Sequence, residues 1–411
     1  MQKKTKAAIL AICLITIIVV SIFIVSLQKS QRPQGKEYQA LAEQLLGEAK
    51  KEFEQIRGVS VRDVTLEVVN KSWVIENWGK AYADPEIAEI HREENIYKEL
   101  FMIYQNDSLY EAKLEWPTAY YAAVWMGKMY IIQENFDITN TLWAESTLVH
   151  ELTHIIQENY SLPQRATFDG TTALTAFTEG DGDFMANAFT NKSILTAYST
   201  NSYSTQSPPV SLGLLLEDKI QPLLPYTVDR LSRFPYAYGK EFVKTLYDTG
   251  GWNAVNQTYA NPPTTTEQIM HPEKYFAQED DKTVTAPTVN GGWNLTRTDQ
   301  FGEYFIRVML SNWLYENEAE QASQGWGGDV MNYYEKSGDF LFTWSVAWDS
   351  VEDAHEFYVA FQDMMKSASA GNVSSDCWFA YNRYLTIQWN GTSTLIVSSP
   401  DQSSLLSVGA N

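Results

Sequence analysis

Cysteine and histidine are scarce in this sequence of 411 residues, which contains two cysteines and five histidines. Cys13 lies inside an apolar run, and Cys377 stands alone near the C-terminus. Two cysteines so placed exclude a disulfide-stapled scaffold, and they do not report the redox compartment. A chain of this length has ample apolar surface for a core without such staples, as one large or two ordinary domains.

Positively charged residues are also scarce. Thirty lysines and arginines stand against 51 aspartates and glutamates, which gives a formal net charge of −21. Residues 1–36 hold six of the basic residues and no acidic one, so residues 37–411 are more acidic still. Nucleic acids are bound through clustered lysine and arginine. The composition therefore excludes nucleic acid as a partner.

The longest uncharged run, residues 7–27, predicts a transmembrane anchor. At 1.5 Å per residue in a helix, its 21 residues span a hydrocarbon core of about 30 Å. Three lysines in residues 1–6 favour a cytoplasmic N-terminus, residues 28–36 form a polar linker, and residues 37–411 are then extracytoplasmic. A cleaved signal peptide is the alternative, but this run exceeds the usual 7–15 apolar residues and no small-x-small cleavage site follows it. We expect a single-pass protein of the cell membrane.

Hydrophobic periodicity predicts an α+β protein. Helical spacing covers residues 38–57, 85–103, 144–159, 168–190 and 351–366, with further helical patterns in 210–260 and 300–320. Strand patterns cover 59–69 and, as two strands joined near Gly127, 120–136; Asn390-Gly391 is typical of a hairpin. A polar stretch near residue 200 suggests a boundary. We expect an N-terminal part, 37–200, with a β-sheet and the active-site helix, and a mainly helical C-terminal part, 201–411, that ends in a β-hairpin.

One short segment carries most of the recognisable chemistry. His150, Glu151 and His154 form the pattern H-E-x-x-H. Side chains four residues apart share one face of a helix, so both imidazoles can bind a single Zn²⁺ at about 2.0–2.1 Å. Glu151 lies one step round the helix, where its carboxylate can reach a metal-activated water as a general base. The alternative is a chance pair of core or surface histidines.

A catalytic zinc needs a third protein ligand, and the best candidate is Glu179. In the sequence, 24 residues separate it from His154, and it lies in a second helical stretch where it shares a helical face with Asp183. We expect Glu179 to bind the metal and Asp183 to accept the spare ring N–H of a ligand histidine. Asp181 points elsewhere on a helix. The alternative is a solvated acidic turn, favoured by Gly180 and Gly182.

At these residues the chain resembles the gluzincin group of thermolysin-like zinc metallopeptidases, which carry H-E-x-x-H on one helix and E-x-x-x-D on the next. The resemblance covers residues 115–190. It implies a zincin-like fold, Zn²⁺ as cofactor, and hydrolysis of peptide bonds in a peptide or protein substrate. It also implies an upstream sheet whose edge strand runs along the cleft. Residues 122–127 are placed where that strand would lie, although they could equally form an ordinary sheet strand.

A donor to the developing oxyanion is expected from residues 262–275. His271 and Tyr275 lie there among polar residues and prolines, and the segment resembles a T-E-Q-x-x-H-P-E-x-Y segment of uncharacterised exported H-E-x-x-H proteins. We therefore expect His271 and Tyr275 to take part in catalysis. The alternative for His271 is a structural histidine that hydrogen-bonds within its own loop.

Together these patterns predict a membrane-anchored, extracytoplasmic zinc metallopeptidase. A rival hypothesis is a non-catalytic surface protein that contains zinc and binds glycan or protein partners. The presence of Glu151 favours the enzyme, because a purely structural zinc site has no need of a base.

Overall fold

The computed structural model describes residues 33, 35–78, 82–199 and 225–409. The predicted cytoplasmic residues 1–6, the predicted anchor 7–27 and most of the predicted linker lie outside these residues. Among the described residues, no helix combines the length and the apolar character that crossing a membrane requires. The described chain has an α+β architecture, as predicted, with two separate sheets.

A three-stranded sheet lies in the N-terminal part. Its order is β1-β3-β2, with β1 (Leu66–Val69) parallel to β3 (Lys128–Ile132) and β2 (Ala122–Trp125) antiparallel to it. Met126 and Gly127 join β2 to β3 with φ of 50° and 73°, the left-handed conformation that tight hairpins require. The two predicted strands are thus confirmed, and β2 is an edge strand. The predicted strand over 59–69 forms only in its last four residues.

Helices surround this sheet. The predicted N-terminal helix is α2 (Lys36–Arg57), and Gly58 ends it with φ of 74°. α6 (Thr141–Gln157) and α7 (Phe168–Ser199) pack against it and against the sheet in one hydrophobic cluster. The remaining helical elements before residue 120 are α3 (Lys71–Asn77), α4 (Asp84–Glu99), α5 (Leu109–Glu115) and the 3₁₀ turn η1 (Trp116–Ala119).

The C-terminal part holds the predicted helices and, beyond the prediction, a large sheet. It contains a seven-stranded antiparallel sheet of order β4-β5-β6-β10-β9-β8-β7. The strands are β4 (Asn294–Asp299), β5 (Trp326–Lys336), β6 (Asp339–Trp348), β7 (Gly371–Ser374), β8 (Cys377–Ala380), β9 (Arg383–Asn390) and β10 (Ser393–Ser399). The predicted terminal hairpin is confirmed as β9 and β10, which are joined at Gly391. β5 and β6 are buried on both faces over most of their length, so they lack the clear alternation that identifies a half-exposed strand.

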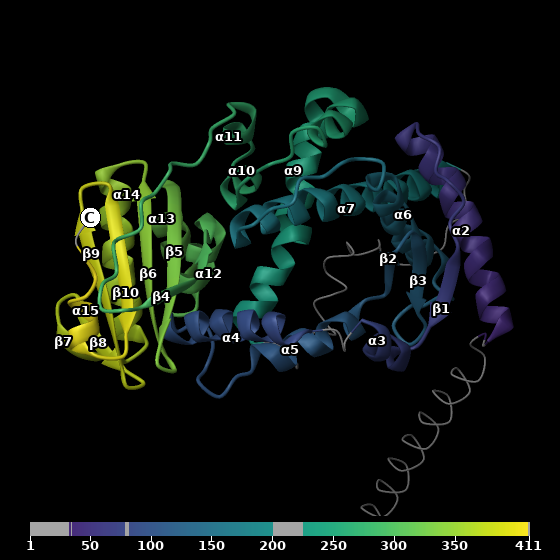
Figure 1. The fold of residues 1–411 in the computed structure, drawn as a ribbon. Coiled ribbons are helices and arrows are strands. Elements are labelled where there is room, and N and C mark those ends of the chain that lie inside the picture. Colours follow the sequence, from purple (N-terminus) through teal and green to yellow (C-terminus); the bar gives the residue numbers. More distant parts are fainter. Residues whose placement is uncertain (1–32, 34, 79–81, 200–224, 410–411) are drawn as a thin grey trace, which may run out of the picture.

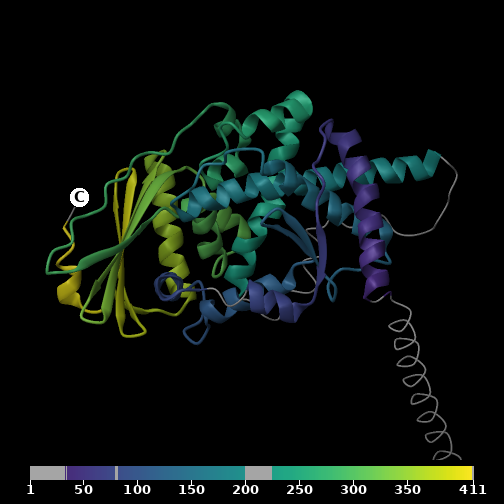
Figure 2. The same cartoon turned by 45° about the vertical axis from the view of Figure 1, so that its right-hand side comes forward.

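The two sheets lie at opposite ends of the molecule, and helices including α4, α5, α7 and α9 lie between them (Figure 1). The described helices of the C-terminal part are α9 (Tyr226–Thr258), α10 (Thr266–Met270), α11 (Pro272–Phe276), α12 (Gly302–Ser311), α13 (Glu316–Ser323), α14 (Val351–Ser367) and α15 (Gln402–Leu405). The turned view in Figure 2 shows α14 lying beside the large sheet. The larger hydrophobic cluster draws on residues from both sides of the predicted boundary near residue 200.

α7 and α9 approach each other closely at two glycines. A Cβ on Gly180 would lie 2.2 Å from the backbone of Gly239, and a Cβ on Gly239 would lie 1.9 Å from the carbonyl oxygen of Ala176. Such distances are far below van der Waals contact, so only glycine fits at either position. This close packing fixes α9 beside the part of α7 that carries Glu179.

Candidate metal centre

Three candidate ligand atoms converge between α6 and α7. His150 Nε2 lies 3.2 Å from both His154 Nε2 and Glu179 Oε2, and His154 Nε2 lies 3.6 Å from Glu179 Oε2. Tetrahedral ligands at about 2.0–2.1 Å from Zn²⁺ stand about 3.3 Å apart. The three atoms therefore stand at the spacing of zinc ligands.

Local helical structure explains this convergence. Asn140 caps α6 by accepting the N–H of Trp143, and the helix then runs unbroken through both histidines. Gly182 of α7 packs against the ring of His150, where a Cβ would come within 2.8 Å of Cε1. Gly180 and Gly182 therefore lie within α7, where they allow close packing against α9 and against the ring of His150. The alternative of a solvated acidic turn is wrong.

Each histidine has an acceptor on its outer ring nitrogen. His150 Nδ1 lies 2.9 Å from Asp183 Oδ1, and His154 Nδ1 lies 2.8 Å from Gln157 Oε1. An acceptor at Nδ1 holds the proton there and leaves the Nε2 lone pair for a metal. The structure brings Asp183 to the expected place, and it adds Gln157, which sequence reasoning missed.

A buried hydrogen-bonded chain extends from Gln157. Its Nε2 donates to the carbonyl of Thr178 and to the hydroxyl of Tyr259, both at 2.9 Å. Tyr259 donates to Asp181 at 2.5 Å, and Arg57 of α2 donates to both oxygens of Asp181, at 2.5 and 2.8 Å. The side chains of Arg57 and Asp181 are fully buried. Asp181 thus anchors the support of His154 and does not contact the candidate ligands.

Glu151 is buried beside the ligands with one free oxygen. Its Oε2 has no hydrogen-bond partner among the described residues, while the backbone of Val124 on the edge strand β2 hydrogen-bonds to the carboxylate. Burial raises the pKa of Glu151, and the two neighbouring histidines oppose that shift. An unpaired buried carboxylate oxygen is costly unless a further group binds there. This orphaned atom therefore fits a water or substrate beside a metal.

Two tyrosines share a small cavity with Glu151. The cavity has a volume of about 60 Å³, and Tyr120, before β2, and Tyr236, on α9, are among its lining residues. Burial raises the pKa of Tyr120 to about 12, and burial together with the charge of Glu179 raises the pKa of Tyr236 well above its usual value. Both hydroxyls therefore keep their protons at neutral pH and can donate hydrogen bonds. Sequence reasoning singled out neither residue.

The structure does not bring His271 or Tyr275 to this cavity, which corrects that prediction. His271 Nε2 lies 3.1 Å from Glu303 Oε1 on α12, and the hydroxyl of Tyr275 donates to the carbonyl of Asn261 at 2.9 Å. Both side chains connect α10 and α11 to neighbouring elements. His271 thus makes structural contacts, although with a carboxylate and not within its own loop.

The titration of the metal-free ligands is strongly coupled. Burial lowers the pKa of His154, but the Glu179 carboxylate outweighs it and raises that pKa to about 9. The pKa of His150 is raised well above its usual value against the same desolvation, by Asp183 and Glu179. The carboxylate of Glu179 is held ionised, because the histidines overcome its burial and lower its pKa. Without a metal the site therefore holds protons that a metal ion must displace.

Comparisons with known proteins assign a family model only to the C-terminal part of the chain. Comparison with curated proteins found no match. A crystal structure from Chloroflexus aurantiacus, of a provisionally assigned hydrolase with a novel fold, is 14% identical with a TM-score of 0.36, over 62% of this chain and 94% of that one. A likeness this low carries no conclusion on activity. Residues 287–408, which hold the seven-stranded sheet, match the model of a domain of unknown function, DUF8575.

Proposed function

We propose that the protein is a zinc-dependent metallopeptidase of gluzincin type. The observation that carries this proposal is the convergence of His150, His154 and Glu179, with ligand atoms 3.2–3.6 Å apart, beside the unpaired oxygen of Glu151. Two imidazoles and one carboxylate are a ligand set of catalytic zinc sites. Among the described residues, no fourth protein ligand joins these three, and they form the one candidate group that contains histidine.

Different residues of this chain would carry out different steps of hydrolysis. Zn²⁺, held by the three ligands, would supply Lewis acidity that activates a water molecule and polarises the scissile carbonyl. Glu151 accepts a proton from the attacking water and passes it to the leaving amine. Tyr236 and Tyr120 donate their O–H groups to the oxyanion that develops on the carbonyl.

In this proposal the edge strand β2 orients the substrate. One side of β2 pairs with β3, and its other side meets no strand among the described residues. The contact between Val124 and Glu151 places this strand beside the general base. An extended peptide that pairs with β2 would therefore present its backbone to Glu151.

The rival hypothesis, a non-catalytic zinc-containing surface protein that binds glycan or protein partners, fits less well. A structural zinc site more often closes its fourth position with a protein ligand. Here a carboxylate with a free oxygen faces a small cavity instead. We further propose that the domain of residues 37–411 is extracytoplasmic and held at the cell membrane by residues 7–27.

Cleavage of a peptide library by the full-length protein, with and without a chelator, tests this function. Glu151→Gln should keep zinc and lose hydrolysis by at least about two orders of magnitude, the scale of a general base. Glu145→Gln is the matched control, because it makes the same change on the same helix outside the cavity, and it should retain activity. A wild type with no more activity than Glu151→Gln would favour the rival hypothesis.

A further inference from the structure

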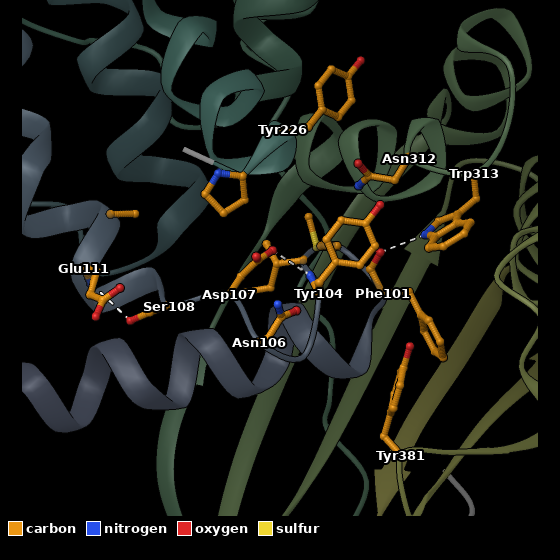
Figure 3. A pocket seen from close by; sticks show the side chains of 14 residues that line it. Phe101, Tyr104, Asn106, Asp107, Ser108, Glu111, Tyr226, Asn312, Trp313 and Tyr381 are labelled. Atoms are coloured by element: carbon orange, nitrogen blue, oxygen red, sulfur yellow. Dashed lines mark hydrogen bonds between the residues drawn. The ribbon is translucent and has the colours of Figure 1, made fainter. Parts of the chain in front are cut away.

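A second, larger cavity lies away from the metal centre. Its volume is about 680 Å³, and none of the candidate metal ligands lines it. Four segments far apart in the chain form its wall: the connection from α4 to α5, the start of α9, the end of α12 and the turn from β8 to β9 (Figure 3). A cavity of this size accommodates a ligand the size of several side chains.

Aromatic rings build one side of this cavity. Phe101 lies between Trp313 and Tyr381, with ring centroids 6.4 and 5.6 Å away, and the indole N–H of Trp313 donates to the carbonyl of Phe101 at 2.8 Å (Figure 3). Phe101 and Tyr381 have φ of 56° and 51°, which is costly for residues other than glycine. Backbone strain of this kind is concentrated at binding sites. Phe101 is buried, and the indole hydrogen bond fixes Trp313 beside it.

Two further rings are largely open to solvent. Tyr104 is 72% exposed and Tyr226 is 60% exposed. Tyr104 sits in a turn braced by Asp107, whose carboxylate accepts the N–H of Tyr104 at 2.9 Å and whose own N–H donates back at 3.1 Å. The ring of Tyr104 is therefore available to stack on a ligand, whereas the guanidinium of Arg230 already lies over the ring of Tyr226.

The charged side chains that line the cavity are both acidic. Asp107 and Glu111 are the charged residues among the described lining residues, which include no lysine, arginine or histidine. The carboxylate of Glu111 has no partner in the described part of the chain, and Figure 3 shows it on the side away from Trp313 and Tyr381. In a chain with a net charge of −21, such a cavity repels anions and attracts cations.

We propose that this cavity binds an arginine-bearing segment of a partner polypeptide. A guanidinium group can stack on an aromatic face and donate two hydrogen bonds to a carboxylate, while its aliphatic stem packs on the remaining rings. The molecule already shows one such contact, because the guanidinium carbon of Arg230 lies 5.7 Å from the ring centre of Tyr226 while Arg230 pairs with Glu316. A neutral sugar would stack on the rings and donate hydroxyl hydrogen bonds to the carboxylates, but it would not gain the attraction between a cation and two negative charges. The proposal stands independently of the metal centre.

Calorimetric titration of the full-length protein tests the proposal. The probes are a blocked Gly-Arg-Gly-Arg-Gly peptide, its counterpart with glutamine at both arginines, and a neutral N-acetylglucosamine tetramer. Saturable binding of the arginine peptide alone is expected. Asp107→Asn with Glu111→Gln should weaken it by about tenfold or more, the loss of charge-assisted hydrogen bonds, and Tyr104→Leu should weaken it by about threefold or more.

A control pair separates the cavity from the general acidity of the protein. Glu76→Gln with Glu241→Gln removes the same charge from exposed carboxylates on α3 and α9 that do not line the cavity, and it should leave the affinity within about twofold of wild type. Equal losses in the two pairs would overturn the proposal, as would equal binding of the glutamine peptide. Binding of the sugar without the arginine peptide would identify a carbohydrate site instead. Thermal melts of each variant confirm that it is folded.

Discussion

Two histidine–glutamate contacts in this molecule look alike as pairs and differ in their surroundings. His150 Nε2 lies 3.2 Å from Glu179 Oε2, and His271 Nε2 lies 3.1 Å from Glu303 Oε1. At the first contact a second imidazole completes a three-atom ligand group. At the second, among the described residues, the histidine meets carboxylates only, and it connects α10 and α11 to α12.

This comparison teaches that a histidine and a carboxylate in contact do not by themselves make a metal site. The region around His150 adds an acceptor behind each imidazole and an orphaned carboxylate oxygen at Glu151. The region around His271 adds three carboxylates instead, those of Glu267, Glu279 and Asp349. The ammonium group of Lys274 pairs with all three, at 2.7, 2.9 and 3.1 Å, and so takes the place of a cation there. The number of convergent donors and their support distinguishes the two regions.

Substitution of one tyrosine in each region should show the largest difference in activity. Tyr236→Phe removes a hydroxyl from the cavity at Glu151 and should lower kcat and kcat/KM together by about 10²–10³, as loss of an oxyanion donor does. Tyr275→Phe makes the same change in the region of His271 and should leave activity per folded molecule unchanged. Steady-state kinetics at matched zinc content checks this. Equal losses in the two variants would return Tyr275 to the catalytic site.

A smaller effect is expected at the support of His154. Gln157→Met removes the acceptor at Nδ1 and should weaken zinc binding by about 10–100-fold, the usual cost of losing such a partner. Gln157→Glu keeps an acceptor there and should recover part of the affinity. Competition with a chelator of known affinity measures both variants. If Gln157→Met binds zinc as tightly as wild type, the hydrogen-bonded chain of side chains from Gln157 to Arg57 stabilises the fold and does not support metal binding.

The residues whose convergence the sequence predicted lie on single helices. His150, Glu151 and His154 lie within five residues of α6, and Glu179 and Asp183 are one turn apart on α7, so helical geometry alone aligns them. The edge strand β2 was predictable for a similar reason, because Gly127 marks a short hairpin. The spacing of residues along the sequence was therefore enough to predict a feature that lies within one helix or one hairpin.

What the sequence did not reveal depends on contacts between distant segments. Tyr236 reaches the cavity only because Gly180 and Gly239 let α9 approach α7, and no local pattern encodes that approach. Gln157 lies three residues beyond His154, where a glutamine in a helix is ordinary. The seven-stranded sheet was missed because β5 and β6 are buried on both faces, which removes the alternation of apolar and polar residues.

The smallest expected effect is on the pH dependence of stability. Histidines whose pKa is raised in the folded state add stability below the unfolded value of about 6.5, and this stability is lost as pH rises through the folded value. For His154 that value is about 9, so the thermal midpoint of the metal-free protein should fall between these limits. Zinc binds deprotonated imidazoles and should tighten over the same range.

Adding zinc to the thermal melts should distinguish the contribution of His150 and His154 to the pH dependence from that of His271. Bound zinc should remove the part of the pH dependence that comes from His150 and His154. It should leave the part that comes from His271, whose pKa is raised by Glu303. Thermal melts across pH, with and without zinc and with His271→Ala as a control, separate these contributions. An identical pH dependence with and without zinc would show that the metal does not engage the histidines of α6.

The zinc content of the purified full-length protein tests the central claim most directly. We expect about one zinc per chain, nearly none in His154→Ala, and about one again in His271→Ala. The last variant should lose about 1–3 kcal/mol of stability, because the buried Glu303 loses its partner. Metal analysis beside a thermal melt gives both values. Full zinc occupancy in His154→Ala, or loss of zinc from folded His271→Ala, would contradict the account.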